Sequence, residues 1–266
     1  MFRATTKILK THAPALHEFV KRAFRRSKLP AVKLLNGRLT LAAPNLTSAT
    51  PTETHVFRWI NELLRPGGTF FDVGAHYGWM SLVACHCVGA TGKVVAFEPS
   101  RPLVEFLEYN KKANGFRQME IVPKAVADSD DRVVPFYLVH RGDSSLNSLI
   151  DHRTESTASQ TEQRSTIQVD TITLDQFCRM TNSHPDAVKI DVEGAELLVL
   201  QGCSLLLREG RTAFIVALHP TWLPDGQEGP RSSLNSFEFM GTRWQPINVW
   251  STMGSILETT CSFQST

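Results

Sequence analysis

Short apolar runs alternate with amphipathic segments through most of the chain. The runs have the length of buried strands and lie at residues 70–73, 94–97, 119–122, 187–190 and 213–218. One predicted helix begins near Pro51 and ends before Pro66, and further helical segments follow at 79–88, 101–114, 174–180 and 196–201. Strands that alternate with helices predict an α/β fold built on a mostly parallel sheet.

Two regions depart from this alternation. Residues 133–139 predict a strand, but residues 153–166 are almost wholly polar and predict a mobile loop. The region 132–166 is therefore an insertion, which serves either as a lid over a ligand or as a tolerated surface excursion. Residues 167–172 alternate like an exposed strand. Near the C-terminus we expect a short helix at 232–240 and an antiparallel hairpin formed by 244–250 and 255–263.

The first 30 residues are strongly basic, with Glu18 as their single acid. Their apolar pattern predicts an amphipathic helix broken near Pro14, and residues 32–41 predict a hairpin around Asn36-Gly37. No apolar run there is long enough for a transmembrane helix or a signal-peptide core. The basic helix is interpreted first as a solvated extension, with peripheral membrane contact or a transit peptide as alternatives. We divide the chain into an extension, 1–50, and a main domain, 51–266, with its core at 51–220.

Composition narrows the class of protein but does not name it. The chain has 266 residues, 42% of them hydrophobic and 20% charged, as expected for one large globular α/β domain with appendages. A formal net charge of +2 gives no reason to expect a nucleic-acid partner. Cys85, Cys87, Cys178, Cys203 and Cys261 form no C-x-x-C pair, so we predict neither a disulfide framework nor a zinc site. This cysteine usage predicts a reducing, cytoplasmic location.

The stretch 69–99 carries the clearest chemistry. A strand bearing Asp72 runs into Gly74-Ala75-His76-Tyr77-Gly78, a helix follows, and the next strand ends at Glu98-Pro99. Glycines let a ligand approach the backbone, and an acid about 20 residues further on can accept the hydroxyls of a ribose. The spacing is neither the dinucleotide fingerprint nor a triphosphate-binding loop, and the carboxylate of Asp72 would repel a pyrophosphate. These demands favour S-adenosylmethionine, which combines a ribose with two cationic groups.

Other acids follow predicted strands or begin helices. Asp128 comes after the third strand, where it could meet an adenine amino group or serve as a turn residue. Glu53 is a weaker candidate for the methionine end of the ligand, with helix capping as its alternative. Asp191 and Glu193 end a buried strand, where we expect them to meet a ligand, Asp191 the cofactor itself, or else a cation or a transferred proton. His219 ends the next strand, at the edge where sites form in such sheets.

Five motifs in this order resemble FkbM-type methyltransferases: DVGAHYGWMSL, GKVVAFEPS, AVAD, TLDQF and VKIDVEGAELLVLQG. The resemblance implies a class I, Rossmann-like methyltransferase fold, with a mostly parallel seven-stranded sheet covered by helices on both faces. It also implies binding of S-adenosylmethionine. Asp72, Gly74, Ala75 and Gly78 match the first cofactor motif, with His76 where many relatives carry asparagine. Glu98 matches the ribose-binding acid.

Further positions match the family or depart from it. Asp191, Glu193 and Gly194 match the K-x-D-x-E-G element of the family. Ala217 stands where relatives commonly carry an acid, so that role has either shifted to His219 or been lost.

We predict O-methylation of a hydroxyl on a small molecule or sugar. Asp191 or His219 could remove the hydroxyl proton, or Asp191 and Glu193 could hold a divalent cation that activates it. A third interpretation makes Glu193 structural, with its carboxylate at the start of the following helix. The alternative function is a non-catalytic module that keeps the fold and binds a membrane or a protein partner.

Overall fold

The computed structural model describes residues 31–34, 38–43, 54–139, 147–151, 164–218 and 236–240. Within these residues the main sheet has six strands in the order β11-β10-β9-β3-β4-β5. Five of them run parallel and the edge strand β11 is antiparallel. Their bounds are β3 (Thr69–Val73), β4 (Lys93–Phe97), β5 (Met119–Val122), β9 (Ala187–Ile190), β10 (Ala213–Leu218) and β11 (Ser236–Met240). The chain builds outward from β3 through β5 and then returns to the other side of β3 as β9, so the strand order reverses between β3 and β9.

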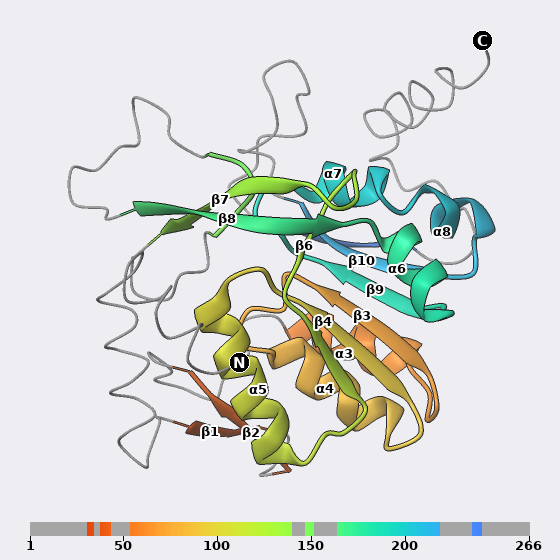
Figure 1. The fold of residues 1–266 in the computed structure, drawn as a ribbon. Coiled ribbons are helices and arrows are strands. Elements are labelled where there is room, and N and C mark those ends of the chain that lie inside the picture. Colours follow the sequence, from red (N-terminus) through yellow and green to blue (C-terminus); the bar gives the residue numbers. More distant parts are fainter. Residues whose placement is uncertain are drawn as a thin grey trace.

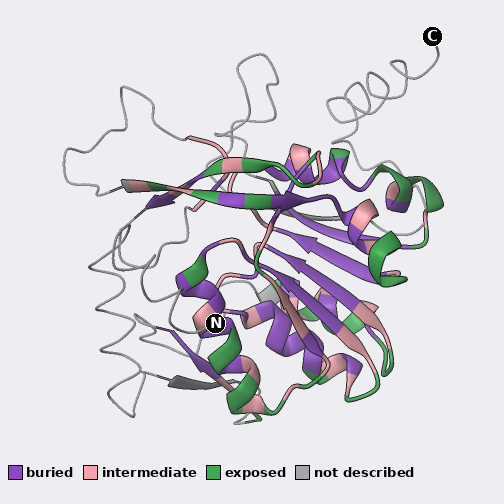
Figure 2. Cartoon of the chain, viewed as in Figure 1, coloured by how far each residue is buried: buried purple, intermediate pink, exposed green. Residues whose placement is uncertain are grey.

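Helices cover both faces of this sheet (Figure 1). One face carries α3 (Thr54–Leu63), α4 (Trp79–Val88) and α5 (Arg101–Asn114), and the other α6 (Leu174–Thr181), α7 (Glu196–Gln201) and α8 (Ser204–Glu209). Because side chains alternate along a strand, Phe70 and Val94 belong to the first core while Phe71 and Val95 belong to the second. Figure 2 shows the central strands buried between the two helical layers.

A second, smaller sheet lies beside the α6–α8 face. It contains β6 (Ala125–Val126), β7 (Val133–Val139) and β8 (Arg164–Ile172), with β8 in the middle. The predicted strand at 133–139 is confirmed. The predicted loop at 153–166 is wrong for its last three residues, because Arg164 and Thr166 pair with Val139 and Tyr137 of β7. Cross-strand pairing there outweighs the polar composition.

The N-terminal hairpin is also confirmed. Strands β1 (Ala31–Leu34) and β2 (Leu39–Ala42) pair antiparallel, with Ala31 opposite Ala42. Leu39 and Leu41 are buried in the same hydrophobic cluster as the core of α3 and α4. The hairpin is thus packed into the main body of the protein. The predicted basic helix at 1–30 lies outside the described residues.

The C-terminal region needs one correction. The predicted helix at 232–240 is wrong, because residues 236–240 form β11 and pair with β10. Phe237 and Phe239 alternate with Glu238, a strand period that the short helix prediction overlooked. The predicted hairpin at 244–263 lies outside the described residues, and the seventh strand of the predicted sheet stays an expectation. No helix among the described segments is long and apolar enough to cross a membrane.

Candidate functional site

Three segments meet where neighbouring strands of the main sheet end. Val73, the last residue of β3, stands between Phe97 of β4 and Ile190 of β9. The residues that follow these three are Gly74, Glu98 and Asp191, so the topology brings together the groups that the sequence singles out. This meeting point lies at the reversal of strand order, where α/β sheets form ligand sites.

A buried lysine joins two of the predicted acids. Lys189 of β9 is 4% exposed, and its Nζ lies 3.5 Å from Asp72 Oδ1 and 3.2 Å from Asp191 Oδ2. The same ammonium donates a hydrogen bond to the Gly74 carbonyl at 3.3 Å. Asp72 also accepts a hydrogen bond from Ser81 Oγ at 2.5 Å. A charge this deeply buried requires such partners, so the network fixes the ends of β3 and β9 relative to each other.

This network changes the interpretation of Asp72. The sequence predicts that its carboxylate meets a cationic ligand, whereas the cation beside it in the fold is Lys189, and Asp72 itself is completely buried. Direct ligand contact by Asp72 stays a prediction. Lys189 and Ser81 were not singled out from sequence. A lysine inside the apolar run 187–190 was the available signal, because a buried strand does not keep an ammonium without partners.

Glu98 is the second buried acid of the site. Its two carboxylate oxygens accept hydrogen bonds from the backbone N–H groups of His76 (3.0 Å) and Ser100 (2.9 Å). Burial raises the pKa of Glu98 to about 7, although these two bonds and the charge of Lys189 act in the opposite direction. Each carboxylate oxygen has a further lone pair, so the group can still accept hydrogen bonds from ligand hydroxyls.

Replacing Glu98 with glutamine should remove a pH dependence of folding stability. The folded carboxyl keeps its proton up to about pH 7, whereas the unfolded chain releases it near 4.5. The wild-type free energy of unfolding should therefore fall by about 3 kcal/mol as the pH rises through this interval. Urea unfolding measured across the interval and above it tests this. Glu108→Gln, at an exposed position of α5, is the control and should keep the wild-type slope. An unchanged slope in Glu98→Gln would contradict the prediction.

Most N–H groups of the glycine loop, residues 74–78, already donate hydrogen bonds within the protein. Gly74 and Ala75 both donate to the Phe97 carbonyl, at 3.1 and 3.0 Å, and Gly78 donates to the Ala75 carbonyl at 2.8 Å. The His76 N–H is taken by Glu98. A phosphate cradle needs several such donors aimed at the ligand. The loop therefore offers few N–H donors to a phosphate group.

One residue of the glycine loop and one of the loop after β9 adopt left-handed backbone conformations, which favour glycine. His76 has φ 54° and Glu193 has φ 53°, and such residues cluster at functional sites. Buried Ser148, in the insertion, donates to the carbonyls of Glu193 (2.7 Å) and Val192 (3.1 Å). The insertion is thus tied to the loop that carries Asp191 and Glu193.

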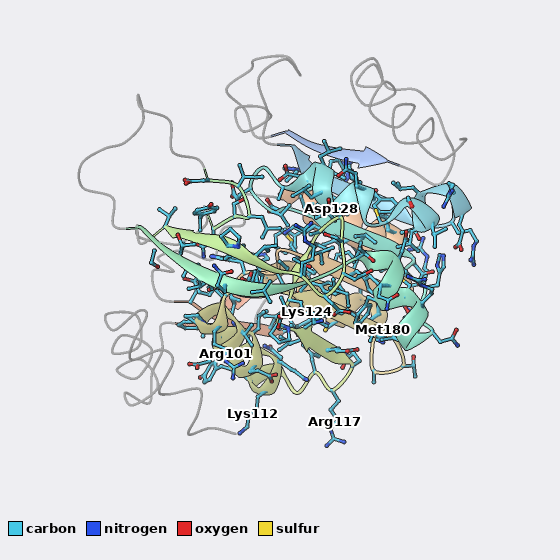
Figure 3. The ribbon with its side chains drawn as sticks, turned by 45° about the horizontal axis from the view of Figure 1, so that its top comes forward. Arg101, Lys112, Arg117, Lys124, Asp128 and Met180 are labelled. Atoms are coloured by element: carbon cyan, nitrogen blue, oxygen red, sulfur yellow. The ribbon has the colours of Figure 1, made fainter. Side chains whose placement is uncertain are left out.

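The remaining predicted residues are placed as follows. Pro99 is half-buried next to Glu98. Asp128 is exposed and accepts a hydrogen bond from Ser129 Oγ at 2.9 Å, after β6 (Figure 3). Glu53 and His219 lie outside the described residues. Within the described segments, no three His, Cys, Asp or Glu side chains are grouped to hold a metal.

The strand order, the glycine loop and the buried acid after the next strand define a Rossmann-like α/β protein. A family model described as the methyltransferase FkbM domain matches residues 72–244. This match covers more than half of the chain, and the protein belongs to the FkbM methyltransferase family. The resemblance stated from the motifs is confirmed.

Comparison with other proteins adds only general likeness. No curated protein matches the chain. Among solved structures, an FkbM methyltransferase from Methylobacillus flagellatus KT is 14% identical, with a TM-score of 0.39 over 63% of this chain and 40% of that one. An S-adenosylmethionine-dependent O-methyltransferase from Thermotoga maritima is 15% identical, with a TM-score of 0.37 over 64% and 45%. An S-adenosylmethionine-dependent methyltransferase from Agrobacterium tumefaciens is 12% identical, with a TM-score of 0.40 over 73% and 55%. This chain thus spans about half the length of these proteins or less.

Proposed function

We propose that the protein is an S-adenosylmethionine-dependent methyltransferase that methylates a hydroxyl group of a small molecule or sugar. Family membership supports methyl transfer. The observation that carries the choice of cofactor is the pairing of the glycine loop with Glu98. The loop offers few free N–H donors, and Glu98 offers a buried acceptor.

The described residues fit this cofactor. A ribose brings two hydroxyl donors, and Glu98 can accept both while keeping its bonds to His76 and Ser100. Gly74 has no Cβ, which lets its backbone lie directly against the Asp191 carbonyl and brings the ends of β3 and β9 together. Glu98 would hold the ribose, and the loop 74–78 would line the remainder of the cofactor.

S-adenosylmethionine, when bound, supplies an electrophilic methyl group for attack by the acceptor hydroxyl. The protein must hold the acceptor in line with that group and take up the hydroxyl proton. Asp191 is our candidate base, because its carboxylate is half-buried at the rim and positioned by Lys189. His219 keeps its place as the alternative base. The hydrogen bonds from Ser148 hold the insertion against residues 192 and 193, where it would help to position the acceptor beside Asp191.

Binding and transfer can be tested on the same preparation. S-adenosylhomocysteine should bind saturably, and about tenfold more tightly near pH 8 than near pH 6, because ribose hydroxyls require the ionised form of a group with a pKa of about 7. Calorimetric titration at the two pH values measures this. Absence of saturation at millimolar ligand would overturn the proposed cofactor.

Transfer of labelled methyl from S-adenosylmethionine to a panel of sugars and small alcohols tests the reaction. Asp191→Asn should lower kcat by about a hundredfold, because loss of a general base typically costs that much. Its binding of S-adenosylhomocysteine should stay close to wild type, which separates a chemical role from a structural one. Full activity in Asp191→Asn would remove Asp191 from the mechanism.

A further inference from the structure

Helix α5 holds the N-terminal hairpin through two asparagines one turn apart. Asn110 Oδ1 accepts from the Ala42 N–H at 2.8 Å, and its Nδ2 donates to the Ala42 carbonyl at 3.0 Å. Asn114 makes the same pair of bonds with Thr40, each of 2.7 Å. An amide side chain has the donor and acceptor of a peptide group. The helix therefore pairs with β2 much as a neighbouring strand would.

The second N–H of each amide goes to a different place. Asn110 donates it to the carbonyl of Tyr77, inside the glycine loop, at 2.8 Å. Asn114 donates it to the carbonyl of Asn110, on its own helix, at 2.7 Å. The two residues thus make the same hydrogen bonds to the hairpin, but only Asn110 makes one to the glycine loop.

The hairpin determines how the Asn110 amide points. Asn110 is completely buried, on the face of α5 opposite Lys112, which points away from the protein (Figure 3). Its one acceptor and both donors are used by Ala42 and Tyr77. Turning the amide over would place its oxygen against two carbonyl oxygens, so the observed orientation is the one that satisfies all partners. Pairing with Ala42 therefore presents an N–H to Tyr77.

The loop needs such external support. His76 is left-handed at φ 54°, a conformation that costs about 1–3 kcal/mol and persists when its surroundings fix it. Glu98 holds the N–H of His76 on one side, and Asn110 holds the carbonyl of Tyr77 on the other. The Tyr77 ring also packs edge-on against Phe106 of α5, with centroids 5.3 Å apart.

We propose that Asn110 is a positioning residue that makes the shape of the glycine loop depend on docking of the β1–β2 hairpin. The hairpin precedes the family match, which begins at residue 72, so the glycine loop is supported by a segment outside the matched region. The effect on loop shape is independent of the proposed function. The effect on affinity rests on it.

Asn110→Ala and Asn114→Ala provide a matched test in the full chain. Both variants lose two bonds to β2, but Asn110→Ala alone releases the loop. Hydrogen exchange of the His76 and Gly78 amides should speed up about tenfold in Asn110→Ala and less than about twofold in Asn114→Ala. The Kd for S-adenosylhomocysteine should rise about tenfold in Asn110→Ala and stay within about twofold of wild type in Asn114→Ala.

Equal exchange at these amides in the two variants, or wild-type exchange in Asn110→Ala, would overturn the proposal. If Asn110→Ala does not fold, Asn110→Ser, which keeps a hydroxyl on the same face of α5, takes its place with the same criteria. If the wild-type protein binds no S-adenosylhomocysteine, the proposed function fails while the exchange comparison still decides the role of Asn110.

Discussion

Replacing Gly74 with alanine should destabilise the protein by more than about 4 kcal/mol or prevent its folding, because the change combines two costs that each act on the backbone. The first is the conformation, since Gly74 has φ +76°, where a Cβ costs about 1–2 kcal/mol. The second is space, since a Cβ at Gly74 would overlap the carbonyl oxygen of Asp191. That oxygen belongs to a backbone segment held by a hydrogen bond of 3.1 Å, which the Asp191 N–H donates to the Val73 carbonyl. The Asp191 carbonyl cannot move without separating the paired strands β3 and β9, a boundary called here the β3–β9 seam.

Gly115→Ala is the matched control for this change. Gly115 ends α5 with φ +70°, but nothing lies within 4 Å of a Cβ built there. It should therefore cost only the conformational part, about 1 kcal/mol. Urea unfolding of both variants separates the two terms, and similar losses would show that close approach at Gly74 has no energetic consequence.

Replacing Lys189 with methionine should cost about 3–5 kcal/mol, because it leaves buried carboxylates without their cation. Asp72 has no exposed surface and Asp191 is half-buried. Both lie within 3.5 Å of the ammonium that would be removed. Methionine keeps most of the volume of the lysine stem, so the loss reports charge more than packing. Chemical unfolding near neutral pH measures it.

Two further variants define the origin of this loss. The double change Asp72→Asn and Lys189→Met should recover part of the stability, because one of the uncompensated charges is removed with the cation. Arg58→Met breaks an exposed pair with Glu62, whose side chains are 73% and 57% exposed, and should cost less than about 0.5 kcal/mol. If Lys189→Met proved as mild as Arg58→Met, the buried network would not be holding the strand ends together.

Much of the fold could be predicted because local pattern and tertiary role agree. The helices at 79–88 and 101–114 have the bounds of α4 and α5. The runs at 70–73 and 187–190 lie within β3 and β9. Parallel strands place their C-terminal ends at one edge, so Gly74, Glu98 and Asp191 could be expected to meet.

What could not be predicted depends on pairing between distant segments. The contact of Lys189 with Asp72 requires the register that sets Asp72 opposite Lys189 across β3 and β9. The strand β11 depends on a partner edge at β10, and the start of β8 at Arg164 depends on Val139. The role of Asn110 depends on the backbone of β2, and no sequence period marks it. In each case a polar or ambiguous segment acquires its structure from a neighbour far away in the chain.

The β3–β9 seam has a consequence for the order in which the molecule assembles. Lys189 and Gly74 are in contact although 115 residues separate them in the sequence, so their meeting closes one of the longer loops of the fold. Contacts of this kind cost loop-closure entropy before they contribute stability, so they form slowly. The glycine loop therefore acquires its final neighbours only after the second half of the sheet has docked. A ligand that binds the glycine loop only in this final arrangement binds the folded protein alone, and it therefore raises the free energy of unfolding.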